Sequence, residues 1–133
     1  MEPTRVLLAD DAPEMLDMVQ HLLEKDCDIV GLAHNGEEAL EAVGTLDPDL
    51  VILDISMPLI DGFQVARRLR ERGHRAKIIF VTVHEDRDYI EAAWMAGALG
   101  YVLKSQLATD LMLALPEVLA GKTFSSLFEF KHS

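Results

Sequence analysis

The chain has 133 residues, of which 50% are hydrophobic and 26% charged, so it is the size and composition of one globular domain with a buried core. Its apolar runs are too short for a membrane helix, its first residues lack a secretory signal, and its single cysteine, Cys27, excludes an intrachain disulfide. We therefore expect a cytoplasmic protein without membrane contact, and its net charge of −11 argues against direct nucleic acid binding by this chain.

Short apolar runs alternate along the chain with segments whose apolar residues recur at helical spacing. The runs are continuous rather than alternating, which is typical of strands buried on both faces of a parallel sheet. Strands are predicted at residues 5–9, 28–33, 50–53, 77–81 and 100–103. Helices are predicted at about residues 12–24, 35–46, 61–69, 86–96 and 107–120. This alternation predicts an α/β fold, a doubly wound five-stranded parallel sheet with five helices.

Local signals set several helix boundaries. Asn35 followed by Glu38, and Asp61 followed by Gln64, have the spacing of a capping box, which predicts two helix starts. Pro116 lies inside the last predicted helix, where it removes a backbone donor. We therefore expect a kink or a restart near residues 112–116.

Polar side chains follow four of the five predicted strands. Asp10 and Asp11 come after the first strand and Asp54 after the third. Thr82 follows the fourth strand and Lys104 the fifth. Sites in open α/β sheets lie outside the carboxyl ends of the strands, so we expect these side chains to converge at one edge.

The chemistry of this set indicates phosphoryl transfer. Clustered carboxylates repel one another, and Mg²⁺ would relieve the repulsion and bridge to phosphate. A lysine and a hydroxyl supply donors for phosphate oxygens, and a carboxylate flanked by Mg²⁺ and lysine can attack phosphorus. Taken singly, each residue has an ordinary explanation, because an aspartate after a strand often caps a helix and a lone lysine is usually solvated. Their combination at successive strand ends favours the functional interpretation.

Five sequence motifs together resemble the receiver domain of bacterial two-component response regulators, over about residues 5–121. They are VLLADD at 6–11, DLVILDISMP at 49–58, DG at 61–62, FVT at 80–82 and YVLK at 101–104. The resemblance implies a flavodoxin-like sheet with strand order 2-1-3-4-5. It also divides the chain into a receiver domain at residues 1–121 and a tail or linker remnant at residues 122–133.

The resemblance assigns roles to the strand-end residues. Asp54 would be the phosphoacceptor. The Mg²⁺ ion would be held by Asp10, Asp11 and Asp54, together with the main-chain carbonyl of Ser56. Lys104 would pair with the phosphoryl group, so the predicted chemistry is limited to Mg²⁺-dependent self-phosphorylation and self-dephosphorylation rather than that of an independent enzyme.

A second group of residues would form the switch. Thr82 would hydrogen-bond to the phosphoryl group, and the Tyr101 ring would turn inward as Thr82 moves. In this family the positions of Ser56 and His84 influence how long the phosphoryl group survives. Val83 stands where the family usually has Ala or Gly, and a larger side chain there would narrow access to the site.

The resemblance predicts a signalling module whose donor is a sensor histidine kinase or a phosphotransfer protein. The signal would pass to an unknown downstream protein partner, and a homodimer is an open possibility. An aspartate-nucleophile phosphatase would need an acidic residue where Ser56 stands. Residues 96–105 and 118–121 look most like the NarL/FixJ branch, so the alternative is the receiver part of a DNA-binding transcriptional regulator with its helix-turn-helix missing from this chain.

The tail contains three of the five phenylalanines, Phe124, Phe128 and Phe130. Two interpretations stay open at this point. The tail is either a partly disordered linker remnant, or its rings cover the body of the domain or a partner.

Overall fold

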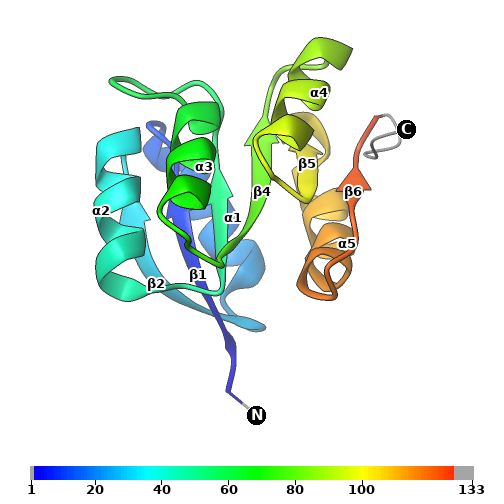
Figure 1. Cartoon of the computed structure of the whole chain (residues 1–133). Coiled ribbons are helices and arrows are strands. Elements are labelled where there is room, and N and C mark those ends of the chain that lie inside the picture. Colours follow the sequence, from blue (N-terminus) through cyan, green and yellow to red (C-terminus); the bar gives the residue numbers. More distant parts are fainter. Residues whose placement is uncertain (1, 128–133) are drawn as a thin grey trace.

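The computed structural model describes residues 2–127, which form a parallel sheet flanked by helices on both faces (Figure 1). The strands are β1 (Thr4–Ala9), β2 (Cys27–Ala33), β3 (Leu50–Leu53), β4 (Lys77–Thr82), β5 (Gly100–Leu103) and β6 (Phe124–Ser125). The helices are α1 (Pro13–Leu23), α2 (Gly36–Leu46), α3 (Gly62–Glu71), α4 (Arg87–Met95) and α5 (Leu107–Leu119), and a 3₁₀ turn, η1 (Lys104–Gln106), precedes α5. The predicted α/β class and five helices are confirmed.

Two separate apolar cores lie on the two faces of the sheet. Helices α2, α3 and α4 pack over one core, and α1 and α5 over the other. Successive strand residues alternate between the cores, so that Leu7 belongs to the first and Leu8 to the second. Because both faces are covered, the strands read as continuous apolar runs. None of the helices in the described part of the chain is long and apolar enough to cross a membrane.

The sheet has six strands in the order β2-β1-β3-β4-β5-β6, so the predicted order is confirmed for the first five strands and the predicted number is wrong. Strand β6 runs parallel to β5, pairing Phe124 with Gly100 and Ser125 with Tyr101. The Phe124 side chain packs against the core beneath α1 and α5, as the second interpretation of the tail requires. The prediction for Phe128 and Phe130 falls on residues outside those that the structure describes.

The predicted helix starts form with one change. At α3, Gln64 N donates to Asp61 Oδ1 at 2.9 Å and Asp61 N donates to Gln64 Oε1 at 3.0 Å, which completes the capping box. At α2, Glu38 N donates to Asn35 Oδ1 at 2.8 Å, but the Glu38 carboxylate accepts from His34 N at 2.8 Å. The capping box at α2 is therefore half formed, because the Glu38 carboxylate accepts from the backbone N–H of His34 rather than from that of Asn35, the cap residue.

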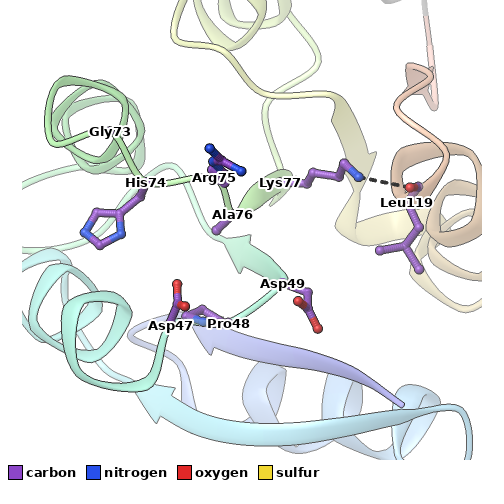
Figure 2. A pocket seen from close by; sticks show the side chains of 9 residues that line it. All are labelled: Asp47, Pro48, Asp49, Gly73, His74, Arg75, Ala76, Lys77 and Leu119. Atoms are coloured by element: carbon purple, nitrogen blue, oxygen red, sulfur yellow. Dashed lines mark hydrogen bonds between the residues drawn. The ribbon is translucent and has the colours of Figure 1, made fainter. Parts of the chain in front are cut away.

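Helix α5 continues through Pro116 to Leu119, so the predicted restart does not occur. Pro116 is exposed, whereas Leu115 and Val118 on the other face of the helix are buried. The missing backbone hydrogen bond therefore lies on the solvent side of the helix. At the end of the helix, Lys77 Nζ donates to the Leu119 carbonyl at 3.0 Å (Figure 2). A cation at this end also complements the helix dipole.

Candidate functional site

The strand ends bring an ammonium group into contact with two buried carboxylates. Lys104 Nζ lies 3.0 Å from Asp10 Oδ2 and 3.3 Å from Asp54 Oδ2. Asp10 and Asp54 are each only 6% exposed. Asp10 follows β1, Asp54 follows β3 and Lys104 follows β5, so three strand ends build this ion-pair cluster as the sequence predicted.

Three carboxylates at this edge are arranged so that they could share a metal ion. One oxygen from each of Asp10, Asp11 and Asp54 lies within 4.8 Å of the others. An all-carboxylate oxygen set of this kind suits a hard divalent cation. Asp11 is exposed, which leaves one side of the cluster open to water and to incoming ligands. Ser56 N donates weakly to Asp54 Oδ1 at 3.4 Å, and the metal-binding role of the Ser56 carbonyl stays a prediction.

Burial and charge act on the cluster in opposite directions. Desolvation by burial raises the pKa of Asp54, and the neighbouring Asp10 charge raises it further, while Lys104 opposes both. Burial lowers the pKa of Lys104, but the hydrogen bond to Asp10 and the charges of Asp54 and Asp10 outweigh it, so the net shift is upward. Lys104 is therefore held as a cation, whereas the charge on Asp54 is disfavoured until more positive charge arrives.

The start of α3 presses directly against the phosphoacceptor candidate. Gly62 N donates to the Ile55 carbonyl at 2.8 Å, which closes the loop after β3. A Cβ atom on Gly62 would lie 2.5 Å from the Asp54 carbonyl oxygen and 2.8 Å from the Phe80 ring. Only glycine fits this approach, so the motif residue Gly62 has a steric role beside the site.

The predicted switch residues are joined through the backbone of His84. The buried Thr82 hydroxyl accepts from His84 N at 3.2 Å. The Tyr101 ring is fully buried, and its hydroxyl donates to the His84 carbonyl at 2.8 Å. Among the described residues the Thr82 hydroxyl makes its hydrogen bond to this loop and none to Asp54 or Lys104. The Tyr101 ring already lies inside the domain in this structure, and the switch roles of Thr82 and Tyr101 stay predictions. The sequence gave no sign that one loop residue connects the two.

The His84 side chain connects the loop after β4 to the loop after β3 and to α4. Its Nε2 atom lies 2.9 Å from Ser56 Oγ, and its ring stacks on Tyr89 with centroids 4.0 Å apart and planes 6° apart. The two positions predicted to influence phosphoryl lifetime are thus hydrogen-bonded to each other. Val83 is 65% exposed and directs most of its surface to solvent.

One surface hollow lies near this edge of the sheet, and another lies far from it. One, of about 320 Å³, lies beside Ser56 and is lined by residues of α3 and α4 that include Phe63 and Tyr89. The other, of about 460 Å³, lies at the opposite edge of the sheet, and Asp47, Asp49, His74 and Arg75 are among the residues that line it (Figure 2).

Comparison with known proteins agrees with this geometry. The family described as response regulator receiver domain matches residues 6–116. The nitrate/nitrite response regulator protein NarL of Escherichia coli K12 is 37% identical over 123 residues, which are 91% of this chain and 57% of that protein. The chemotaxis protein CheY of Halobacterium salinarum is 36% identical over 88% of this chain and 98% of its own length.

A solved structure leads to the same fold. The signal receiver domain of the putative response regulator NarL from Mycobacterium tuberculosis superposes with a TM-score of 0.87 at 30% identity, covering 92% of this chain and all of that one. The chain spans little more than half the length of the E. coli NarL protein it resembles.

Proposed function

The chain belongs to the response regulator receiver domain family, and on that basis we propose that Asp54 is the residue on which it accepts a phosphoryl group. Receiver domains are phosphorylation-dependent signalling modules rather than conventional enzymes, and they interact with histidine kinases or phosphotransfer proteins and with output domains. One observation carries the proposal for Asp54. Its buried carboxylate lies 3.3 Å from the Lys104 ammonium, within a cluster of three carboxylates at the carboxyl edge of the sheet.

The proposed chemistry needs positioning and charge neutralisation. A carboxylate oxygen of Asp54 attacks phosphorus, a new O–P bond forms, and the bond from phosphorus to the donor breaks. When bound, Mg²⁺ would supply positive charge to the phosphoryl oxygens. Asp10, Asp11 and Asp54, with the Ser56 carbonyl, are the residues proposed to hold it, and Lys104 contributes the second positive charge. Attack of water on the same phosphorus would reverse the modification.

The proposed switch begins at Thr82. A phosphoryl group on Asp54 offers new acceptor oxygens, and the Thr82 hydroxyl, which accepts from His84 N, can donate its own O–H to one of them. A shift of Thr82 toward that group would pull on its bond with His84 N. The His84 carbonyl also holds the Tyr101 hydroxyl, so the change passes to the buried ring. Any movement of this loop alters the surface around α4 and β5 and would change protein–protein contacts.

We further propose the family's usual setting for this chain. The donor is a sensor histidine kinase or a phosphotransfer protein, the compartment is the cytoplasm, and an unknown downstream protein receives the signal. Two copies of the chain can also pair as a homodimer. Residues 1–121 would form most of the receiver body, and β6 adds a last short strand to its sheet. The second candidate is the receiver part of a DNA-binding transcriptional regulator, which is favoured by the chain covering only 57% of the E. coli response regulator NarL.

Intact mass measured after incubation with Mg²⁺ and acetyl phosphate tests the proposal. The wild type should gain one phosphoryl group, Asp54→Asn should gain none, and chelation with EDTA should abolish uptake. Asp17→Asn, on an exposed position of α1, is the matched control and should react like the wild type. An adduct that survives in Asp54→Asn, or no adduct in the wild type, would overturn the assignment.

A further inference from the structure

Strand β6 pairs with β5, the strand that contains Tyr101 and ends directly before Lys104. We infer that Ser126 is a positioning residue, whose hydroxyl fixes the end of β5 from which Lys104 enters the phosphorylation site. The inference rests on the proposed function of Asp54. It adds to that function a residue from a segment that the family match, residues 6–116, does not include.

The first step concerns a buried backbone donor. Leu103 is the last residue of β5 and is 2% exposed. Its N–H points toward β6, but β6 ends at Ser125, which pairs with Tyr101, so the strand has no residue opposite Leu103. Ser126 Oγ accepts from Leu103 N at 3.1 Å, so a side-chain oxygen continues the ladder by one rung. A buried N–H without a partner costs free energy, so the Ser126 hydroxyl stabilises the end of β5 by accepting this hydrogen bond.

The second step concerns how Ser126 itself is held. Its own N–H donates to the Tyr101 carbonyl at 3.0 Å. Two residues earlier, Phe124 N donates to the Leu99 carbonyl at 3.0 Å, and the Phe124 side chain packs into the core beside α5. Ser126 therefore bonds to β5 at Tyr101 and at Leu103, and the next residue along the chain after Leu103 is Lys104.

The third step connects this anchor to the chemistry. Lys104 begins the η1 turn directly after Leu103, and its ammonium must reach both Asp10 at 3.0 Å and Asp54 at 3.3 Å. Its side chain is 16% exposed, so little solvent is present to replace a lost contact. Reaction rates respond steeply to misplacement of such groups, because a shift of about 1 Å can cost about 100-fold. Loosening of the Leu103 amide should therefore slow phosphoryl uptake.

Rates of phosphoryl uptake from acetyl phosphate with Mg²⁺ test the inference. Ser126→Ala should slow uptake by about 10-fold, which is half of the activation free energy lost in a full 1 Å misplacement. Ser126→Thr keeps a hydroxyl and should restore most of the rate. Ser125→Ala is the matched control, because Ser125 Oγ accepts only a local bond from Leu127 N at 3.3 Å, and its rate should equal that of the wild type. Equal rates for Ser126→Ala and Ser125→Ala would overturn the inference.

A double-variant cycle separates positioning from general loosening. If Ser126 acts through Lys104, Ser126→Ala should cause no further slowing in a Lys104→Ala background. The same slowing in both backgrounds would contradict the positioning role. Should the wild type take up no phosphoryl group, the proposed function of Asp54 fails, and the NMR resonance of the Lys104 ammonium then decides the matter. That resonance should shift in Ser126→Ala and stay in place in Ser125→Ala, and an unmoved signal in both would overturn the inference.

Discussion

Replacement of Asp54 by Asn should stabilise the metal-free fold at neutral pH, although it removes the residue proposed to react. Asp54 is 6% exposed, and its carboxylate lies within 4.8 Å of oxygens from Asp10 and Asp11. Burial, followed by the charge of Asp10, raises the pKa of Asp54, and Lys104 only partly opposes this. The charged form of Asp54 therefore costs free energy in the folded chain, and Asn avoids that cost.

The distances give the size of the effect. At an effective dielectric constant of about 20, unit charges 4.8 Å apart interact by about 3.5 kcal/mol, and charges 3.3 Å apart by about 5 kcal/mol. Repulsion from Asp10, at least about 3.5 kcal/mol, therefore offsets most of the attraction to Lys104, and desolvation by burial, the largest cause of the raised pKa of Asp54, turns the balance against the charged form. The exposed Asp11 is screened by water and adds little, so with burial included we expect a net cost on the order of 1 kcal/mol. For a chain of this size we expect Tm to rise by about 3 to 5 °C.

The pH dependence follows from the sign of the shift. Because the folded pKa of Asp54 lies above its unfolded value, the cost is absent below about pH 4, where the unfolded carboxyl is protonated, and complete above the folded pKa. The advantage of Asp54→Asn over the wild type should therefore appear as pH rises from about 4. Added Mg²⁺ should then stabilise the wild type more than the variant, because binding to the folded state adds stability.

Thermal unfolding in EDTA from pH 4 to pH 8 is the assay, with Asp17→Asn as the control for loss of one exposed charge. If Asp54→Asn is less stable than the wild type at pH 7, attraction to Lys104 outweighs burial and repulsion, and the reasoning is refuted. A stability difference that does not change with pH would refute it as well.

Two further changes test packing and the switch. Gly62→Ala places a Cβ atom 2.5 Å from the Asp54 carbonyl oxygen and should lower the free energy of unfolding by about 3 kcal/mol in urea titrations, whereas Gly44→Ala, in open space on α2, should raise it by about 0.5 kcal/mol. Equal effects of the two would contradict the steric role. Tyr101→Phe removes the 2.8 Å bond to the His84 carbonyl and should cost about 1 kcal/mol in the same titration, and an unchanged midpoint would mean that this bond adds nothing to the fold.

The sequence was enough to predict most of the sheet and the members of the ion-pair cluster. Strands β1, β3, β4 and β5 are apolar on both faces, so their ends could be located within a residue or two. Once the ends are known, parallel topology places Asp10, Asp54 and Lys104 at one edge without any knowledge of loops. Their convergence follows from strand direction alone, which is why it could be predicted.

Features that depend on the paths of loops could not be predicted. Strand β6 has two residues and no apolar period, so nothing in Phe124 and Ser125 distinguishes it from a linker. The connection of Thr82 and Tyr101 through His84 depends on where the loop after β4 places one peptide group. Capping signals also compete locally, as when the Glu38 carboxylate bonds to His34 N rather than completing the capping box at α2.

The parallel direction of β6 decides where additions to the polypeptide would be located. Helix α5 descends to the edge of the sheet at which β1 begins, and β6 carries the chain back toward the edge that holds Asp54 (Figure 1). A fluorophore or affinity tag joined before Thr4 would therefore lie at the far edge from the acidic cluster, whereas one joined after Leu127 would start on the same edge. Surface immobilisation through the beginning of the chain therefore leaves the reactive edge accessible.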